Sequence, residues 1–185
     1  MIPLKVYVQI ISFQLALIIK YIFVGMERVS NSSIYFDWAC HLWNWASFET
    51  ICGAGLDRST EEGIKQASKH FQQAAGIFEY IQNNIISHIR GSPISCLSND
   101  VLKFSKNLSL AQASLCFYEK AIRDKKPAII AKLAAQTSLY YSATSASCRA
   151  AVLTANIDPT WANNAEFHTT LLSGATEYWQ SQVKK

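Results

Sequence analysis

Histidine and cysteine are the residues in this chain best suited to chemistry, yet their spacing supports neither catalysis nor metal binding. No Cys-x-x-Cys pair and no zinc-ligand spacing occurs among His41, His70, His88, His168, Cys40, Cys52, Cys96, Cys116 and Cys148. No nucleophile lies beside a matching base in the sequence, and the Gly-Ala-Gly of residues 53–55 lacks the strand and lysine of a phosphate loop. We therefore expect no enzyme activity, cofactor or metal, and reduced, mostly buried thiols in a cytosolic protein.

A different kind of chemistry, the binding of an apolar partner, is suggested by residues 108–136. They have the pattern of the end of one amphipathic helix, a short basic turn and the start of another helix. Ile129 and Leu133 are four residues apart and share one helix face. An adjacent stripe suited to inward packing consists of Ile130, Ala134, Thr137 and Tyr141. Phe117, Ile129 and Leu133 are therefore candidates to line a groove for another molecule's helix, the alternative being that all three belong to the core.

The composition indicates one folded domain. The chain has 185 residues, of which 50% are hydrophobic and 16% are charged, and this excludes a disordered chain. Five tryptophans, eight tyrosines and nine phenylalanines supply large side chains to bury. The net charge is +4 and the basic residues are scattered, so we expect no nucleic-acid partner.

Beyond residue 30 the sequence predicts helices separated by short breaks. We expect them near residues 34–52, 61–87, 99–124, 127–155 and 159–183. Residues 53–55 would end the first helix, residues 59–62 (Ser-Thr-Glu-Glu) have the form of a capping box, and residues 91–93 (Gly-Ser-Pro) break the chain again. Pro127 and Pro159 fit first-turn positions. Long helices with short loops predict an all-α fold of antiparallel helical hairpins in a TPR-like solenoid bundle.

Residues 1–30 form an apolar leader. Between residues 2 and 25 the charges are Lys5 and Lys20. The alternation of apolar and other residues from 4 to 10 is typical of a half-buried strand, so we expect a short β element followed by a helix. A membrane segment is the alternative, although Lys20 and two glutamines interrupt the apolar run. No small-residue cleavage site follows, which argues against a signal peptide, and a non-native leader is the third interpretation.

Three stretches, in the right order, resemble the Bro domain family. They are residues 57–81 (DRSTEEGIKQASKHFQQAAGIFEYI), the hairpin of residues 110–136, and residues 163–168 (NNAEFH). The resemblance is closest to the ALIX-like branch and covers about residues 33–185. Bro domains are longer than this, so we interpret residues 31–185 as a partial Bro-like helical domain.

The resemblance implies a non-enzymatic adaptor in ESCRT-dependent endosomal sorting and membrane remodelling. Such Bro domains bind the amphipathic C-terminal helix of an ESCRT-III subunit in a concave apolar groove. Matched by motif, Phe117, Ile129 and Leu133 would supply the apolar contacts, and Lys65 and Glu61 would lie on the polar rim. The turn at residues 123–127 is one residue shorter than the ALIX-type turn. The implied location is the cytoplasm, associated with endosomes, with peripheral contact to the membrane.

Two other interpretations fit the same sequence. The chain is a Bro-like domain of another branch with a different cytosolic ligand, or it is a truncated, membrane-anchored product without a groove function. The rim residues also have ordinary explanations, since carboxylates such as Glu61 favour a helix start and Lys65 suits a solvated helix face. Persistent pelleting in carbonate extraction would support the anchor.

Overall fold

Within the residues that the structure describes, helices are the only regular secondary structure. The computed structural model describes residues 33–89, 95–155 and 157–183, the side chains of 152–155 excepted. Its long helices are α2 (Ile34–Gly55), α3 (Glu61–Tyr80), α4 (Asn99–Asp124), α5 (Pro127–Ala155) and α6 (Thr160–Val183). Short helical turns follow α3 and precede α4, namely η1 (Ile81–Ile85), η2 (Ile86–His88) and η3 (Ser95–Leu97). The predicted all-α fold is confirmed. The expected β element, the apolar leader and the break at residues 91–93 lie outside the described residues.

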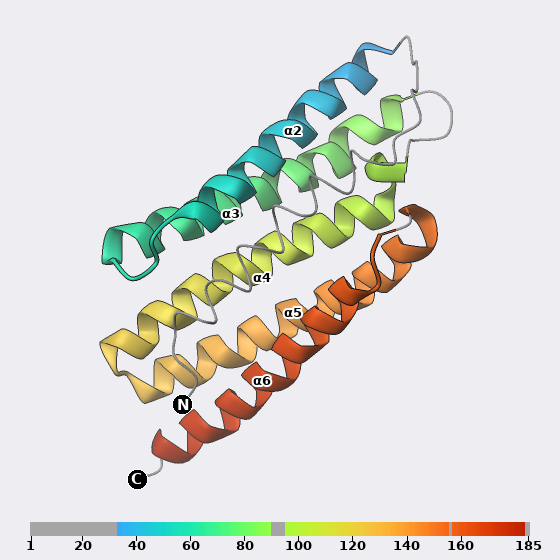
Figure 1. Ribbon diagram of the computed structural model, residues 1–185. Helices are drawn as coiled ribbons and strands as arrows, with labels where there is room; N and C mark the ends of the chain where they lie inside the picture. Colours follow the sequence, from blue (N-terminus) through green and yellow to red (C-terminus); the bar gives the residue numbers. More distant parts are fainter. Residues whose placement is uncertain (1–32, 90–94, 156, 184–185) are drawn as a thin grey trace.

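The helices stack in chain order as an antiparallel array. Each long helix packs mainly against its neighbours in sequence, α2 on α3, α3 on α4, α4 on α5 and α5 on α6 (Figure 1). This is the arrangement that long helices and short connections predict. It places the α4–α5 hairpin in the middle of the stack, between α3 and α6.

Aromatic contacts along the core join α2 to α3, which are adjacent in the stack, and α4 to α6, which are one helix apart. Trp43 of α2 meets Phe78 of α3 edge to face at 5.0 Å between ring centroids, and Phe104 of α4 meets Trp161 of α6 in the same manner at 6.3 Å. Phe71 of α3 is fully buried. The array is therefore held by a continuous core, with α4 buried over most of its length.

The structure corrects the predicted end of the first helix. α2 continues through Gly53 to Gly55 and is followed by Leu56 in an extended conformation. A Cβ atom at Gly53 would lie 3.1 Å from Cε1 of Phe71 and 3.2 Å from Cβ of His70. Gly53 therefore allows α2 to approach α3 closely and does not terminate the helix.

The predicted capping box at residues 59–62 was wrong by one residue. The N-cap of α3 is Thr60, whose Oγ1 accepts a hydrogen bond from the backbone N–H of Gly63 at 3.0 Å. The third helical position is therefore Gly63, which has no side chain to accept a hydrogen bond from the N-cap backbone N–H, as a glutamate would in a capping box. A Cβ at residue 63 would lie 2.0 Å from the Asp57 carbonyl oxygen, which explains the glycine.

The far end of α3 also differs from the prediction of one regular helix to residue 87. After Tyr80 the backbone continues as the π-helical turn η1 and then as η2. Ile81 and Ile85 are buried within η1. A single wider turn of this kind changes which side chains face the core, and the apolar repeat of the sequence does not reveal it.

Candidate functional site

The turn between α4 and α5 sets the position of the candidate apolar residues. α4 ends at Asp124, and Lys125 adopts a left-handed conformation with φ of 54° while its N–H donates to the Ile122 carbonyl at 3.2 Å. A residue in this conformation reverses the chain after a helix, a place usually taken by glycine. Pro127 then begins α5, as predicted. Two antiparallel helices therefore meet with Phe117 near the end of one and Ile129 at the start of the other.

We define the hairpin face as Phe117, Ile129 and Leu133. Phe117 is 46% exposed, Ile129 is 47% exposed and Leu133 is half-buried. The adjacent stripe of α5 faces inward, with Ile130, Ala134, Thr137 and Tyr141 all buried. Phe117 directly follows six consecutive buried residues of α4. Phe117 is thus a large exposed side chain next to a buried stretch of α4, and Ile129 is a large exposed side chain beside the buried stripe of α5.

Two ion pairs show which side of α4 carries Phe117. Nζ of Lys120 lies 3.0 Å from Oε1 of Glu61, and Nζ of Lys106 lies 3.3 Å from Oε1 of Glu79, so both lysines of α4 reach α3. Phe117 is one turn before Lys120 and three turns after Lys106, so it shares their helix face. Because α3 and α4 are antiparallel, Lys65, one turn after Glu61, lies level with Phe117 along the two helices.

Glu61 and Lys65, the residues that the resemblance implied for a polar rim, lie beside Phe117, and their role in binding stays a prediction. Glu61 pairs with Lys120, a residue that the sequence interpretation did not include, and Lys65 is exposed. The hydrogen bond from Lys120 and its charge, with a smaller contribution from Lys65, hold the pKa of Glu61 below its ordinary value. The same hydrogen bond raises the pKa of Lys120. Lys120 follows Phe117 by three residues, a spacing that provided a signal for this neighbour.

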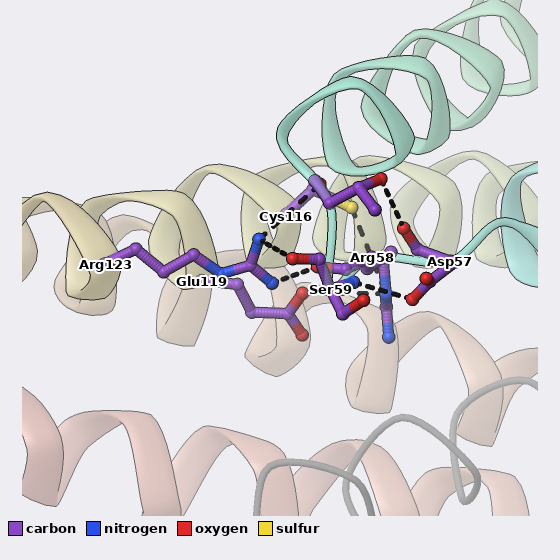
Figure 2. A network of polar contacts seen from close by, with 7 residues as sticks. Asp57, Arg58, Ser59, Cys116, Glu119 and Arg123 are labelled. Carbon is purple, nitrogen blue, oxygen red and sulfur yellow. Dashed lines mark hydrogen bonds and ion pairs between the residues drawn. The ribbon is translucent and has the colours of Figure 1, made fainter.

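A buried charge cluster, which we call the loop clamp, fixes the α2–α3 loop to the end of α4 (Figure 2). Arg58 is 4% exposed, and its Nε lies 3.5 Å from Oε2 of Glu119, while its Nη1 lies 3.8 Å from Sγ of Cys116. The Arg123 guanidinium donates to the backbone carbonyls of Arg58 and Ser59, the latter at 2.9 Å. Two arginines therefore hold the α2–α3 loop against the end of α4, the helix that carries Phe117.

Burial is the largest influence on the pKa values of Glu119 and Cys116 in the loop clamp. It raises the pKa of Glu119, although Arg58 and Arg123 oppose the shift. Burial likewise raises the pKa of the Cys116 thiol to about 11, against the charge of Arg58. A thiol with so high a pKa is a poor nucleophile at neutral pH. The clamp is therefore a structural support for the site and not reactive chemistry.

Three of the four histidines take part in packing or pairing within the described residues, and the cysteines there are free thiols. His70 lies 2.6 Å from Oε2 of Glu49, and His88 stacks on Tyr35. His168 is buried and stacks on Tyr141, and burial lowers its pKa to about 4. Among the described residues no group of three or more His, Cys, Asp or Glu is placed to hold a metal ion.

The length and apolar character of the described helices bear on membrane insertion. None of those helices combines the length and apolar character that crossing a bilayer requires. The apolar leader, on which the predicted alternative of a membrane segment fell, lies outside the described residues.

The stacked antiparallel helices, with exposed apolar residues on their central hairpin, define an α-helical scaffold domain. The family model described as the BRO1-like domain matches residues 5–185, and the chain belongs to this family. The sequence-based resemblance is thereby confirmed.

Relatives with this domain come from fungi and animals. The chain is 34% identical over 154 residues to the pH-response regulator protein palA/RIM20 of Emericella nidulans, covering 83% of this chain and 18% of that protein. It is 33% identical over 156 residues to the vacuolar protein-sorting protein BRO1 of Gibberella zeae, covering 84% and 15%. It is 32% identical over 173 residues to human programmed cell death 6-interacting protein, covering 89% and 20%. The chain thus spans a fifth or less of these relatives.

A solved structure supports the same assignment. The fold matches the structure described as "ALIX BRO1 CHMP4C complex" with a TM-score of 0.78 and 29% sequence identity. The match covers 84% of this chain and 43% of that one. The helical array described above is therefore a section of an ALIX-like BRO1 fold.

Proposed function

We propose that this chain is a non-enzymatic adaptor that binds the amphipathic C-terminal helix of an ESCRT-III subunit in an apolar groove at the hairpin face. Through this partner it acts in the cytoplasm at endosomal membranes, in protein sorting and membrane remodelling. The observation that carries the proposal is the exposure of Phe117 and Ile129 on the two adjacent helices of the α4–α5 hairpin. The similar ALIX BRO1 structure is described as a complex with CHMP4C, which supports this class of partner.

The geometry of the hairpin face suits a helix as ligand. Ile129 and Leu133 are one helical turn apart, and Phe117 belongs to the antiparallel neighbour. A partner helix with apolar side chains three and four residues apart would pack along this line. Such interfaces derive most of their affinity from a few large, buried anchors, and these three residues are of the required size.

The charge around the hairpin face indicates the polar side of the partner. Besides Lys65 and Lys120, the turn and the first turns of α5 carry exposed basic side chains, namely Arg123, Lys125, Lys126 and Lys132. A partner helix with acidic residues beside its apolar stripe would complement them. Because these charges are exposed, they should govern the rate and orientation of binding more than its strength.

The proposal is tested by titrating a labelled peptide of an ESCRT-III C-terminal helix into the purified chain and measuring fluorescence anisotropy. Wild-type protein should bind saturably, and Ile129→Asp should weaken binding at least about tenfold, because a charge would replace a buried anchor. Circular dichroism should show unchanged helicity, since Ile129 is half-exposed.

A matched control lies on the same helix. Leu139 of α5 is 65% exposed and does not belong to the hairpin face, so Leu139→Asp should leave binding unchanged. Undiminished binding by Ile129→Asp would remove the assigned residues from the interface. A folded wild-type chain without saturable binding would refute the proposed partner class.

A further inference from the structure

The first helix of the stack carries a line of exposed large apolar side chains. We define the α2 stripe as Ile34, Trp38, Trp45 and Phe48, which are 79%, 44%, 53% and 62% exposed. Their spacing of four, seven and three residues puts them on one helix face. Two of the five tryptophans of the chain therefore lie on the surface, although the composition suggested that they would be buried.

The opposite face of α2 is already used by the core. Ala39, Trp43 and Ala46 are buried there, against α3 and the turns that follow it. α2 is therefore apolar on both sides, and a helix with this pattern is normally covered on both. Part of the stripe is anchored at its edge, since Trp38 contacts Tyr80 edge to face at 6.0 Å and Nε1 of Trp45 donates to Glu49 at 2.8 Å.

We propose that the α2 stripe is the docking face for residues 2–25 of the same chain. These residues are mostly apolar, and the BRO1-like family match begins at residue 5, so the segment belongs to the same domain as α2. Eight residues separate position 25 from Ile34, enough to reach about 26 Å and to return the segment along α2.

Length and charge support the same occupant. From Ile34 to Phe48 the α2 stripe is about 21 Å long, which about 14 helical or 6 to 7 extended residues would cover. The segment of residues 2–25 exceeds both lengths and contains Lys5 and Lys20 but no acidic residue. α2 contains the exposed Asp37 and no lysine or arginine, and its other carboxylate, Glu49, already contacts His70 and Trp45. The segment of residues 2–25 and the surface of α2 therefore carry opposite charges as well as apolar side chains.

The competing occupants are a second copy of the chain and a lipid bilayer. An attached segment has an effective concentration in the millimolar range, which a second copy does not reach in dilute solution. A bilayer surface recognised by aromatic side chains commonly has basic residues beside them, whereas the charged residues of α2 are acidic. The attached segment is therefore the occupant that the chemistry favours.

The experiment places the photoreactive amino acid p-benzoylphenylalanine at position 48 of the full chain. Unlabelled and ¹⁵N-labelled chains are mixed with phosphatidylcholine vesicles, irradiated and digested. We expect cross-links to residues 2–25 within one isotopic species. Mixed-isotope cross-links would identify a second copy, lipid adducts would identify the bilayer, and absence of cross-links to residues 2–25 would overturn the proposal. The same label at position 139 of α5 serves as the control and should not capture this segment.

A second measurement does not depend on the label. Under native conditions trypsin should cleave after Lys20 slowly in the wild type and at least about fivefold faster in Phe48→Glu, because cleavage follows the undocked population. In the control variant Leu139→Glu, trypsin should cleave after Lys20 at the wild-type rate. Equal rates in Phe48→Glu and wild type, with helicity retained in both, would show that the segment is not held by the α2 stripe.

Discussion

The hairpin face and the α2 stripe are both exposed apolar surfaces, but they differ in what borders them. Basic side chains lie near the hairpin face, and the loop clamp holds the end of α4, the helix that carries Phe117. The α2 stripe is larger, has no basic residue on its own helix, and follows closely after an apolar segment of the same chain. The hairpin face therefore has the features of a site for another molecule, and the α2 stripe those of an unfinished internal contact.

This difference shows why exposure alone does not identify a binding site. Large exposed patches mark interfaces of several kinds, including contacts within one chain. What separates the two surfaces here is the rigidity of the base, the sign of the neighbouring charges and the distance along the chain to an apolar segment. Substitutions can change the first two of these and can disrupt the contact that the third makes possible.

The largest effect is expected from removing the support of the hairpin face. Arg58→Ala would leave Glu119 buried without its partner, and breaking a buried pair in this way costs about 3–5 kcal/mol of unfolding free energy. Urea unfolding followed by tryptophan fluorescence measures the loss. Arg149→Ala is the matched control, since it removes an exposed pair of 2.6 Å with Glu166 and should change stability by less than about 0.5 kcal/mol. Similar values for the two variants would mean that the clamp is not a rigid base.

A charge placed on the α2 stripe should affect stability, and a charge placed on the hairpin face should affect peptide binding. Phe48→Glu should lower the unfolding free energy by about 2 kcal/mol, because it places a charge where an apolar segment docks, while binding of the ESCRT-III peptide changes little. Ile129→Asp should do the reverse, with a change in stability of less than about 1 kcal/mol and loss of binding. Chemical unfolding and peptide titration on both variants give the comparison. If both variants lost the same property, the two surfaces would have one role.

Much of the fold was predictable because its helix boundaries are local. Pro127 begins α5 as predicted, and Asp158 precedes α6 with its carboxylate accepting from the Thr160 N–H at 2.9 Å. Gly53 was misinterpreted, since a glycine that ends a helix and one that permits close helix packing look alike in sequence. The difference depends on Phe71, eighteen residues away, and therefore on tertiary structure.

The candidate site was predictable in part for the same reason. The spacing of Ile129 and Leu133 gave their shared face, and the inward stripe beginning at Ile130 is confirmed by burial. The loop clamp was not foreseen, because Arg58 and Glu119 are 61 residues apart and no local pattern pairs them. The binding roles of Phe117, Ile129 and Leu133 remain predictions, as do those of Lys65 and Glu61.

A smaller effect is expected at the turn that sets the register of the hairpin face. Lys125 has φ of 54°, a conformation that costs a non-glycine residue about 1 kcal/mol. Lys125→Gly should therefore raise the unfolding free energy by up to about 1 kcal/mol, and peptide binding should hold if the register is set by Pro127 and α5. Lys126→Gly, one residue on, is the control and should not stabilise. A loss of binding in Lys125→Gly would show that the strained turn itself positions Ile129.

The smallest effect concerns the rim, and it tests whether charge or apolar contact dominates at the hairpin face. Lys120→Gln should weaken peptide binding less than about threefold, mainly through slower association, because exposed pairs contribute little and are screened by salt. The pKa of Glu61 is lowered in the folded chain, so any contribution of the Glu61–Lys120 pair is present above the ordinary carboxylate pKa of about 4.3 and is lost as the pH falls through the lowered value. Stopped-flow association at low and high salt, with Arg149→Gln as control, measures the effect. If Lys120→Gln lost as much binding as Ile129→Asp does, and the loss persisted at high salt, the charged rim and not the apolar residues would be the main determinant of peptide affinity.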